Sequence, residues 1–279
     1  MRLAIFIALL LSASASAEST VGMCFAFPDS GTLNIFEVEA KLPVKTCMIV
    51  LFADEHGPAH EAGLQGYDVI THVGGELISS FEVASEAFAK AAPGKPISVL
   101  YQRPVVRGQR VNWRRLRTKV TPVEKIEFLK KVVISEENPA TASTIYRFHE
   151  DKPKLPESTQ LEVLLVKTDG ITTPVLKPIY VGDIDWLFAR RLTFITDSDR
   201  IEITPDDWGR DNTHKQTWEW CHVAGPEDSP ERKALEALAN QKLISVVFHG
   251  EDYYSEYNVK LYEGYKASLM MDYLKEVLR

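Results

Sequence analysis

The sequence is poor in cysteine, and it lacks both long apolar runs and the short motifs of common catalytic sites. Its three cysteines, Cys24, Cys47 and Cys221, form no Cys-x-x-Cys pair, so neither a zinc site nor a thioredoxin-type site is indicated. An odd number allows at most one internal disulfide. Two interpretations are therefore possible: a disulfide between Cys24 and Cys47, or three buried free thiols. There is no Gly-x-Ser-x-Gly elbow and no Walker loop. The sequence therefore predicts no catalytic residue, no metal and no cofactor.

The first seventeen residues differ from the rest of the chain. Arg2 gives a positive start, residues 3–11 are almost entirely apolar, and Ala15-Ser16-Ala17 supplies the small residues of a cleavage site. The apolar run is shorter than the roughly 20 residues that a membrane-spanning helix needs. We therefore expect a signal peptide over residues 1–17, cleaved near Ala17, and a periplasmic or extracellular mature protein.

The stretch from Gly57 to Gly75 is the most informative part of the sequence. Pro58 suits the first position of a short helix, and Gly63 suits the left-handed position that ends one. An apolar segment around Ile70 follows and closes at a double glycine, which is typical of a strand entering a hairpin turn. These residues predict a compact, turn-rich β unit.

The order of residues in this stretch resembles the signature of bacterial PDZ domains of the type carried by the high-temperature-requirement family of envelope proteases. That pattern runs roughly G-x-P-A-x-x-A-G-L-x-x-G-D-x-I-x-x-V-N-G. With the first spacer residue missing, the matching positions are Gly57, Pro58, Ala59, Ala62, Gly63, Leu64, Asp68, Ile70, Val73 and Gly75. Tyr67 stands where the family has a glycine, and Gly74 replaces an asparagine. The resemblance implies a PDZ-like domain over residues 31–121, a partly open β-barrel with a flanking helix, after a lead-in at 18–30 and without the protease domain.

The resemblance also implies a peptide-binding groove. In the family, a peptide adds as a strand between one strand and the long helix, and loop N–H groups hold its terminal carboxylate. The implied positions here are Thr32, Leu33, Asn34, Ile35, Phe36 and Val38 in the strand, and Phe81, Ser85 and Phe88 in the helix. An apolar C-terminal residue is the favoured ligand. Asn34 stands where the family loop has glycine, so a blocked or unused groove remains an alternative.

A basic segment follows the signature. Lysine and arginine crowd the interval from Lys95 to Lys131, where only Glu124 and Glu127 are acidic. The basic strand at 103–119 could contact an anionic membrane surface or dock on the acidic second half of the chain. Its charges could also keep an exposed sheet edge from pairing with strands of other molecules. The predicted export argues against a nucleic-acid partner.

Residues 122–141 are predicted to form a linker and residues 142–279 a second, β-rich domain. Predicted strands cover 143–149, 160–167, 175–181, 186–188, 192–195, 200–203, 217–223, 243–249 and 253–261, and predicted helices cover 230–241 and 263–278. This half resembles uncharacterised β-rich modules of exported bacterial proteins. The expected fold class is mixed α+β and β-rich, with an antiparallel sandwich-like domain and two C-terminal helices.

These observations favour an exported, non-catalytic protein that binds a peptide or protein C-terminus and acts as an adaptor, sensor or scaffold in the cell envelope. Two alternatives remain. In the first, the PDZ-like fold is only structural and the second domain binds the partner. In the second, the second domain is an enzyme whose active-site residues form no recognisable motif.

Overall fold

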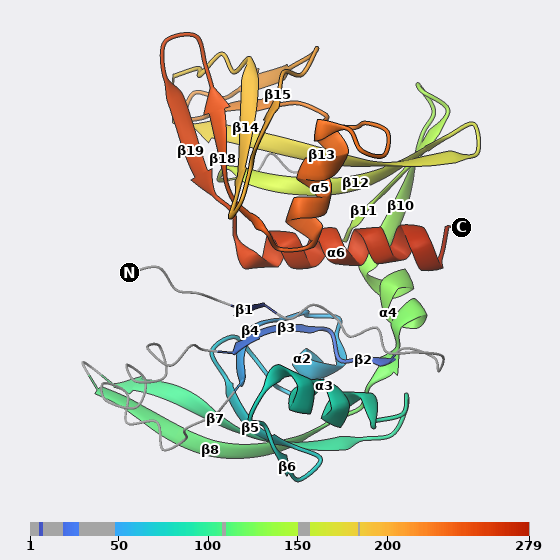
Figure 1. Ribbon diagram of the computed structural model, residues 1–279, viewed down its shortest axis with the longest axis vertical. Coiled ribbons are helices and arrows are strands. Elements are labelled where there is room, and N and C mark those ends of the chain that lie inside the picture. Colours follow the sequence, from blue (N-terminus) through green and yellow to red (C-terminus); the bar gives the residue numbers. More distant parts are fainter. Residues whose placement is uncertain are drawn as a thin grey trace. The chain divides into compact units, whose positions relative to one another are not determined.

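A computed structural model of the chain describes residues 6–7, 19–27, 48–107, 110–149, 157–183 and 185–278. The chain divides into two compact units, Met1–Phe128 and Leu129–Arg279. Strands predominate over helices (Figure 1), and in the described ranges the strands form antiparallel sheets and no closed barrel. The predicted mixed, β-rich class is confirmed.

The first unit is built on one large sheet with two helices beside it. The sheet order is β1-β3-β4-β5-β7-β8, with β6 paired to β5, and β2 and β9 form a small separate pair. The elements are β1 (Phe6–Ile7), β2 (Ser19–Thr20), β3 (Met23–Phe27), β4 (Met48–Ala53), α2 (Pro58–Glu61), β5 (Val69–Val73), β6 (Glu76–Leu77), α3 (Phe81–Ala89), β7 (Ile97–Arg107), β8 (Arg110–Val120) and β9 (Val123–Glu124).

Apolar residues of the central strands form the core of the first unit. Met48 and Val50 of β4, Ile70 of β5 and Val99 of β7 are fully buried in one cluster. Burying one such side chain contributes about 1.5–3 kcal/mol, so this cluster supplies much of the unit's stability. The helix α3 begins at a Ser80 cap, whose hydroxyl accepts a hydrogen bond from the N–H of Val83.

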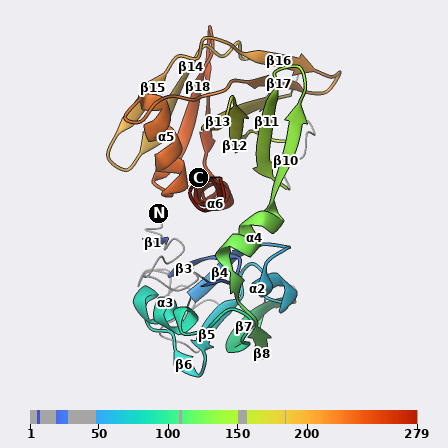
Figure 2. The ribbon, with the colours of Figure 1, turned by 90° about the vertical axis from the view of Figure 1, so that its right-hand side faces the viewer.

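The second unit contains two antiparallel sheets and two helices (Figure 2). Their orders are β10-β11-β12-β13-β17-β16 and β15-β14-β18-β19. The elements after α4 (Lys125–Val132) are β10 (Val133–Asn138), β11 (Ser143–Phe148), β12 (Gln160–Thr168), β13 (Ile171–Gly182), β14 (Arg191–Thr196), β15 (Arg200–Ile203), β16 (Gly209–Asn212), β17 (Thr217–Trp220), α5 (Pro230–Ala239), β18 (Leu243–His249), β19 (Tyr254–Asn258) and α6 (Leu261–Glu276).

Local sequence explains the main features of the second unit. The β12–β13 hairpin turns at Asp169-Gly170, where both residues have positive φ, as a two-residue primed turn requires. The helix α5 starts at the Ser229 cap with a proline in its first turn. The helix α6 is tied to β12 by Glu263, whose buried carboxylate accepts a 2.8 Å hydrogen bond from the N–H of Leu161.

Several predicted strands differ from the observed ones. Residues 186–188 form no strand, because Phe188 adopts a positive φ that a strand cannot continue. The strand predicted at 253–261 ends at Asn258, and α6 already begins at Leu261. The lead-in at 18–30 contains β2 and β3, and the linker at 122–141 contains β9, α4 and β10. The strand β16 was not expected, since its Gly-Arg-Asp-Asn sequence has low strand propensity.

Candidate functional site

The signature stretch folds into a compact turn in the first unit. Pro58 takes the first position of α2, where its missing N–H breaks no hydrogen bond. Gly63 follows with a φ of +83°, a conformation in which glycine carries no steric cost. Ala59 and Leu64 are buried in the core. The residues that match the family pattern therefore shape this turn and anchor it.

Asp68 ties the turn to the sheet. Its fully buried carboxylate accepts a 2.9 Å hydrogen bond from the N–H of Gln65 and bonds of 2.7 and 2.6 Å from two nitrogens of Arg103 on β7. Arg103 also donates to the carbonyl oxygen of Gly63 at 2.6 Å. Tyr67, where the family has glycine, is held at a φ of +71°. The ion pair thus locks a turn that contains a strained tyrosine.

The structure describes only part of the predicted peptide-binding set. The strand residues of that set lie outside the described ranges, namely Thr32, Leu33, Asn34, Ile35, Phe36 and Val38. Phe81 and Ser85 lie on α3, but their side chains are not described. Phe88 is half-buried and packs against the core of the first unit. The groove predicted between residues 33–38 and α3 therefore remains a prediction.

The strand β3 was not predicted, and it forms part of this region. It pairs with β4 on one side, and its residues Ala26 and Phe27 pair on the other side with Ile7 and Phe6 of β1. Met23 of β3 belongs to the same core cluster as the buried alanines of α3. An extended segment thus already lies along the end of this strand.

A glycine turn leads into β3. Gly22 has a φ of +62°, and a Cβ there would lie 2.8 Å from the Cα of Gly57. Its carbonyl oxygen accepts a 2.9 Å hydrogen bond from the N–H of Asp54. The sequence Val21-Gly22-Met23 fits the Φ-G-Φ pattern of the family's carboxylate-binding loop. That pattern is the sequence signal that could have marked β3 as a candidate strand.

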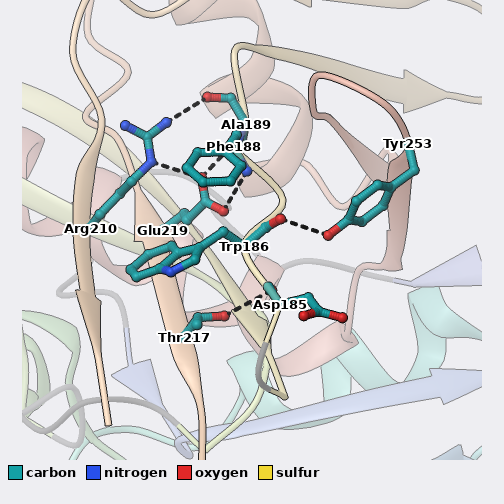
Figure 3. A network of polar contacts seen from close by, with 8 residues as sticks. All are labelled: Asp185, Trp186, Phe188, Ala189, Arg210, Thr217, Glu219 and Tyr253. Carbon is teal, nitrogen blue, oxygen red and sulfur yellow. Dashed lines mark hydrogen bonds and ion pairs between the residues drawn. The ribbon is translucent and has the colours of Figure 1, made fainter. Parts of the chain in front are cut away.

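A second candidate site lies in the second unit, around the buried carboxylate of Glu219 on β17 (Figure 3). Its Oε1 accepts a 2.8 Å hydrogen bond from the N–H of Phe188, and its Oε2 accepts one of 2.8 Å from the N–H of Ala189. Arg210 on β16 donates to Oε2 at 3.2 Å and to the carbonyl oxygen of Ala189 at 3.3 Å. Three donors bind this carboxylate, which therefore holds the loop in place.

Two further contacts fix the start of the same loop. Thr217 donates to the carbonyl oxygen of Asp185 at 3.2 Å, and the hydroxyl of Tyr253 donates to that of Trp186 at 2.7 Å (Figure 3). Partial burial, together with Asp185 and Glu219, raises the pKa of Tyr253, so its hydroxyl keeps the proton that it donates. These contacts anchor residues 185–189, although this part of the loop contains no regular secondary structure.

This loop displays aromatic rings at the surface. Phe188 is 48% exposed and has a φ of +50°, and its ring centroid lies 6.3 Å from that of Trp186. The guanidinium of Arg210 lies 5.8 Å from the Phe188 ring centroid. A strained backbone that keeps a large apolar ring exposed is more often found at binding sites than elsewhere on a surface.

The described cysteines offer no reactive group. Cys24 and Cys221 are buried and free, and burial raises the pKa of Cys24 to about 11 and that of Cys221 to about 12. Both therefore remain thiols at neutral pH, when a nucleophile would need to be a thiolate. Cys47, the predicted partner of Cys24 in one alternative, lies outside the described residues.

No protein-family model matches this chain, and no curated protein sequence matches it. Within the part of the chain that the structure describes, every helix is too short or too polar to cross a membrane.

Proposed function

We propose that the protein is an exported, non-catalytic binding protein, and that its first unit is a PDZ-like module that receives an extended peptide or protein C-terminus. The observation that carries the proposal is the pairing of β1 with the edge of β3. An edge strand that accepts one extended segment presents the backbone groups needed to accept another, which is the basis of β-strand addition.

The neighbourhood of β3 supports this choice of strand. The Gly22 turn precedes it directly, and only glycine fits there because of the close approach of Gly57. Along β3, Met23 and the half-buried Phe25 pack against the same core cluster as Phe88 of α3. A peptide beside β3 would therefore have a glycine turn at one end. In this proposal β3 replaces residues 32–38 as the binding strand.

The test uses the chain with residues 1–17 removed, because that form leaves the β3 edge without β1. A C-terminal peptide library supplies a ligand, and fluorescence anisotropy measures its affinity as the free acid and as the amide. We expect the free acid to bind at least tenfold more tightly, because a charged hydrogen-bonded group contributes about 1.5–3 kcal/mol. Equal affinities would rule out carboxylate capture, and no binding by any library member would rule out the groove.

Substitutions then locate the site. Gly22→Ala should abolish binding, while Gly63→Ala is the matched control, because it adds the same backbone strain but meets no atom within 4 Å. Asn34→Gly separates the two strand assignments. This substitution restores the glycine of the family pattern. It should raise the affinity for the peptide if residues 32–38 form the groove, and it should leave that affinity unchanged if β3 forms it.

A second candidate function follows from the loop around Glu219. The exposed ring of Phe188, with the half-buried ring of Trp186 beside it, favours a partner that binds the second unit, with the first unit serving only as a structural module. Pull-downs with the full chain and with Phe188→Ala distinguish the two functions. Loss of the captured partner in Phe188→Ala, with normal capture by Gly22→Ala, would assign binding to the second unit.

A further inference from the structure

Positive charge is concentrated in one part of an acidic protein. The chain carries a formal net charge of −7, yet no acidic residue occurs between Glu86 and Glu124. The cations of this interval are Lys90, Lys95, Arg103, Arg107, Arg110, Arg114, Arg115, Arg117 and Lys119. Most of them lie on the long β7–β8 hairpin of the first unit (Figure 1). Arg103 pairs with Asp68 and Lys90 pairs with Glu76, so these two cations contribute no unpaired charge to the surface.

The pairing of β7 with β8 shows which cations share a surface. Leu116 packs against the core and Val120 is fully buried in it, so the even-numbered side of this part of β8 faces inward. Side chains alternate along a strand, and Arg115, Arg117 and Lys119 therefore lie on the opposite side. All three are exposed, and among the described residues none of them takes part in an ion pair. They form a row with a spacing of about 7 Å.

The same outward side becomes apolar toward the hairpin end. Trp113 is half-buried and pairs across the ladder with the half-buried Pro104 of β7, and Val111 is exposed. Leu100 of β7 lies opposite Arg117 in the ladder and adds a half-buried apolar side chain to the same face. The outward face thus combines a row of cations with a tryptophan and aliphatic groups on one side of the hairpin.

We propose that this outward face of β7 and β8 binds the surface of an anionic phospholipid bilayer. A row of exposed cations on one side of a strand can contact several phosphate headgroups at once, and each cation near such a surface strengthens binding about fivefold. Tryptophan prefers the boundary between headgroups and acyl chains, which Trp113 would reach while the cations contact the phosphates. The face is separate from the β3 edge, so the inference does not depend on the proposed peptide binding.

The experiment is sedimentation of the full chain with phospholipid vesicles. One set is phosphatidylcholine alone, and the other contains about a third phosphatidylglycerol, which supplies the negative surface potential. The quantity measured is the ratio of the two binding constants, because the apolar residues 3–11 can bind either vesicle. We expect the triple variant R115Q/R117Q/K119Q to lower this ratio by about 100-fold, at about fivefold per cation.

The matched control is K233Q/K242Q/K275Q, which removes the same charge from exposed lysines of the second unit. It should leave the ratio unchanged. If both triple variants behave alike, or if the full chain shows no preference for anionic vesicles, the proposal is wrong. Binding to heparin with no binding to anionic vesicles would also overturn it, in favour of a soluble polyanion.

Salt dependence covers the case in which the triple variant fails to fold. Binding of the unaltered chain to anionic vesicles should weaken strongly between low salt and about 0.5 M salt, where the screening length falls to a few ångströms. Binding that persists unchanged at high salt would contradict an electrostatic contact. The triple variant could instead stay folded, keep its preference for anionic vesicles and aggregate. That result would overturn the proposal and show that the cations only prevent pairing between sheet edges.

Discussion

The substitution Glu219→Gln tests whether a buried carboxylate holds the exposed loop of the second unit. Both carboxylate oxygens are in use, since Oε1 accepts from Phe188, and Oε2 accepts from Ala189 and Arg210. Glutamine has nearly the same shape but only one acceptor oxygen. Its NH₂ group must therefore face either the N–H of Phe188 or the donors of Ala189 and Arg210, whichever way the amide is turned.

The magnitude follows from these contacts. A hydrogen bond to a charged group contributes about 1.5–3 kcal/mol, and a buried donor without an acceptor costs about 1–3 kcal/mol. Release of Phe188 from its positive φ returns about 1–2 kcal/mol, because the left-handed conformation is unfavourable for a residue with a Cβ. The free energy of unfolding of the second unit should therefore fall by about 1–5 kcal/mol.

Urea denaturation followed by tryptophan fluorescence measures this loss, because Trp218 and Trp220 flank Glu219 in the same strand. The control is Glu202→Gln, which removes an exposed partner of Arg191 and should change the midpoint very little. A loss below about 1 kcal/mol for Glu219→Gln, with an unchanged slope, would refute the assigned role of this carboxylate.

Four other predictions concern single groups. Tyr67→Gly should raise the free energy of unfolding by about 0.5–1 kcal/mol in urea denaturation, because glycine relieves the positive φ, whereas Tyr67→Ala should give no gain. Asp68→Asn should lower the protection of first-unit amides in hydrogen exchange by about 2–4 kcal/mol, because it leaves a guanidinium without its anion; unchanged protection would contradict the role of this pair. Cys24 and Cys221 should resist iodoacetamide in the native protein at about pH 8 and react after unfolding, as mass spectrometry would show; rapid native labelling of either would contradict their raised pKa values. Burial raises the pKa of Glu263, so the stability that this group contributes is present at low pH and is lost as the pH rises above the ordinary carboxyl range. The urea midpoint of the unaltered chain should therefore fall relative to that of Glu263→Gln between about pH 4 and neutrality. Midpoints of the two proteins that change in parallel with pH would contradict this.

The turn around the signature could be predicted because neighbouring residues determine it. Pro58, Gly63 and the glycine pair at 74–75 each require a local backbone conformation, and all of them adopt it. The same holds for the Asp169-Gly170 hairpin and for the proline-started helix α5. In each case the signal lies within a few residues of the structure that it specifies.

The strand β3 could not be predicted in the same way. Its sequence, Met-Cys-Phe-Ala-Phe, has no polar alternation, and its partner strand β4 begins only at Met48. The one local signal for a strand at this position is Gly22 between the apolar residues Val21 and Met23. A strand was instead expected at residues 32–38, where an alternating pattern makes a stronger local signal, and those residues lie outside the described ranges.

The loop at residues 185–190 shows the opposite error. Trp-Leu-Phe has high strand propensity, so a strand was expected. A carboxylate on β17, far along the sequence, instead captures two successive N–H groups of the loop and bends it away from any ladder. Such a contact between distant segments leaves no trace in the local sequence, which is why this candidate site was missed.

In the proposed function, the pairing of Phe6–Ile7 with β3 also makes the N-terminal segment a tethered competitor for the peptide. A short connection gives such a segment an effective concentration of about millimolar, so a free peptide of equal intrinsic affinity would need about the same concentration to displace half of it. In the proposed function, a chain that keeps residues 1–17 would bind weakly, and removal of those residues would open the edge. Export and readiness to bind would then be timed by one proteolytic event.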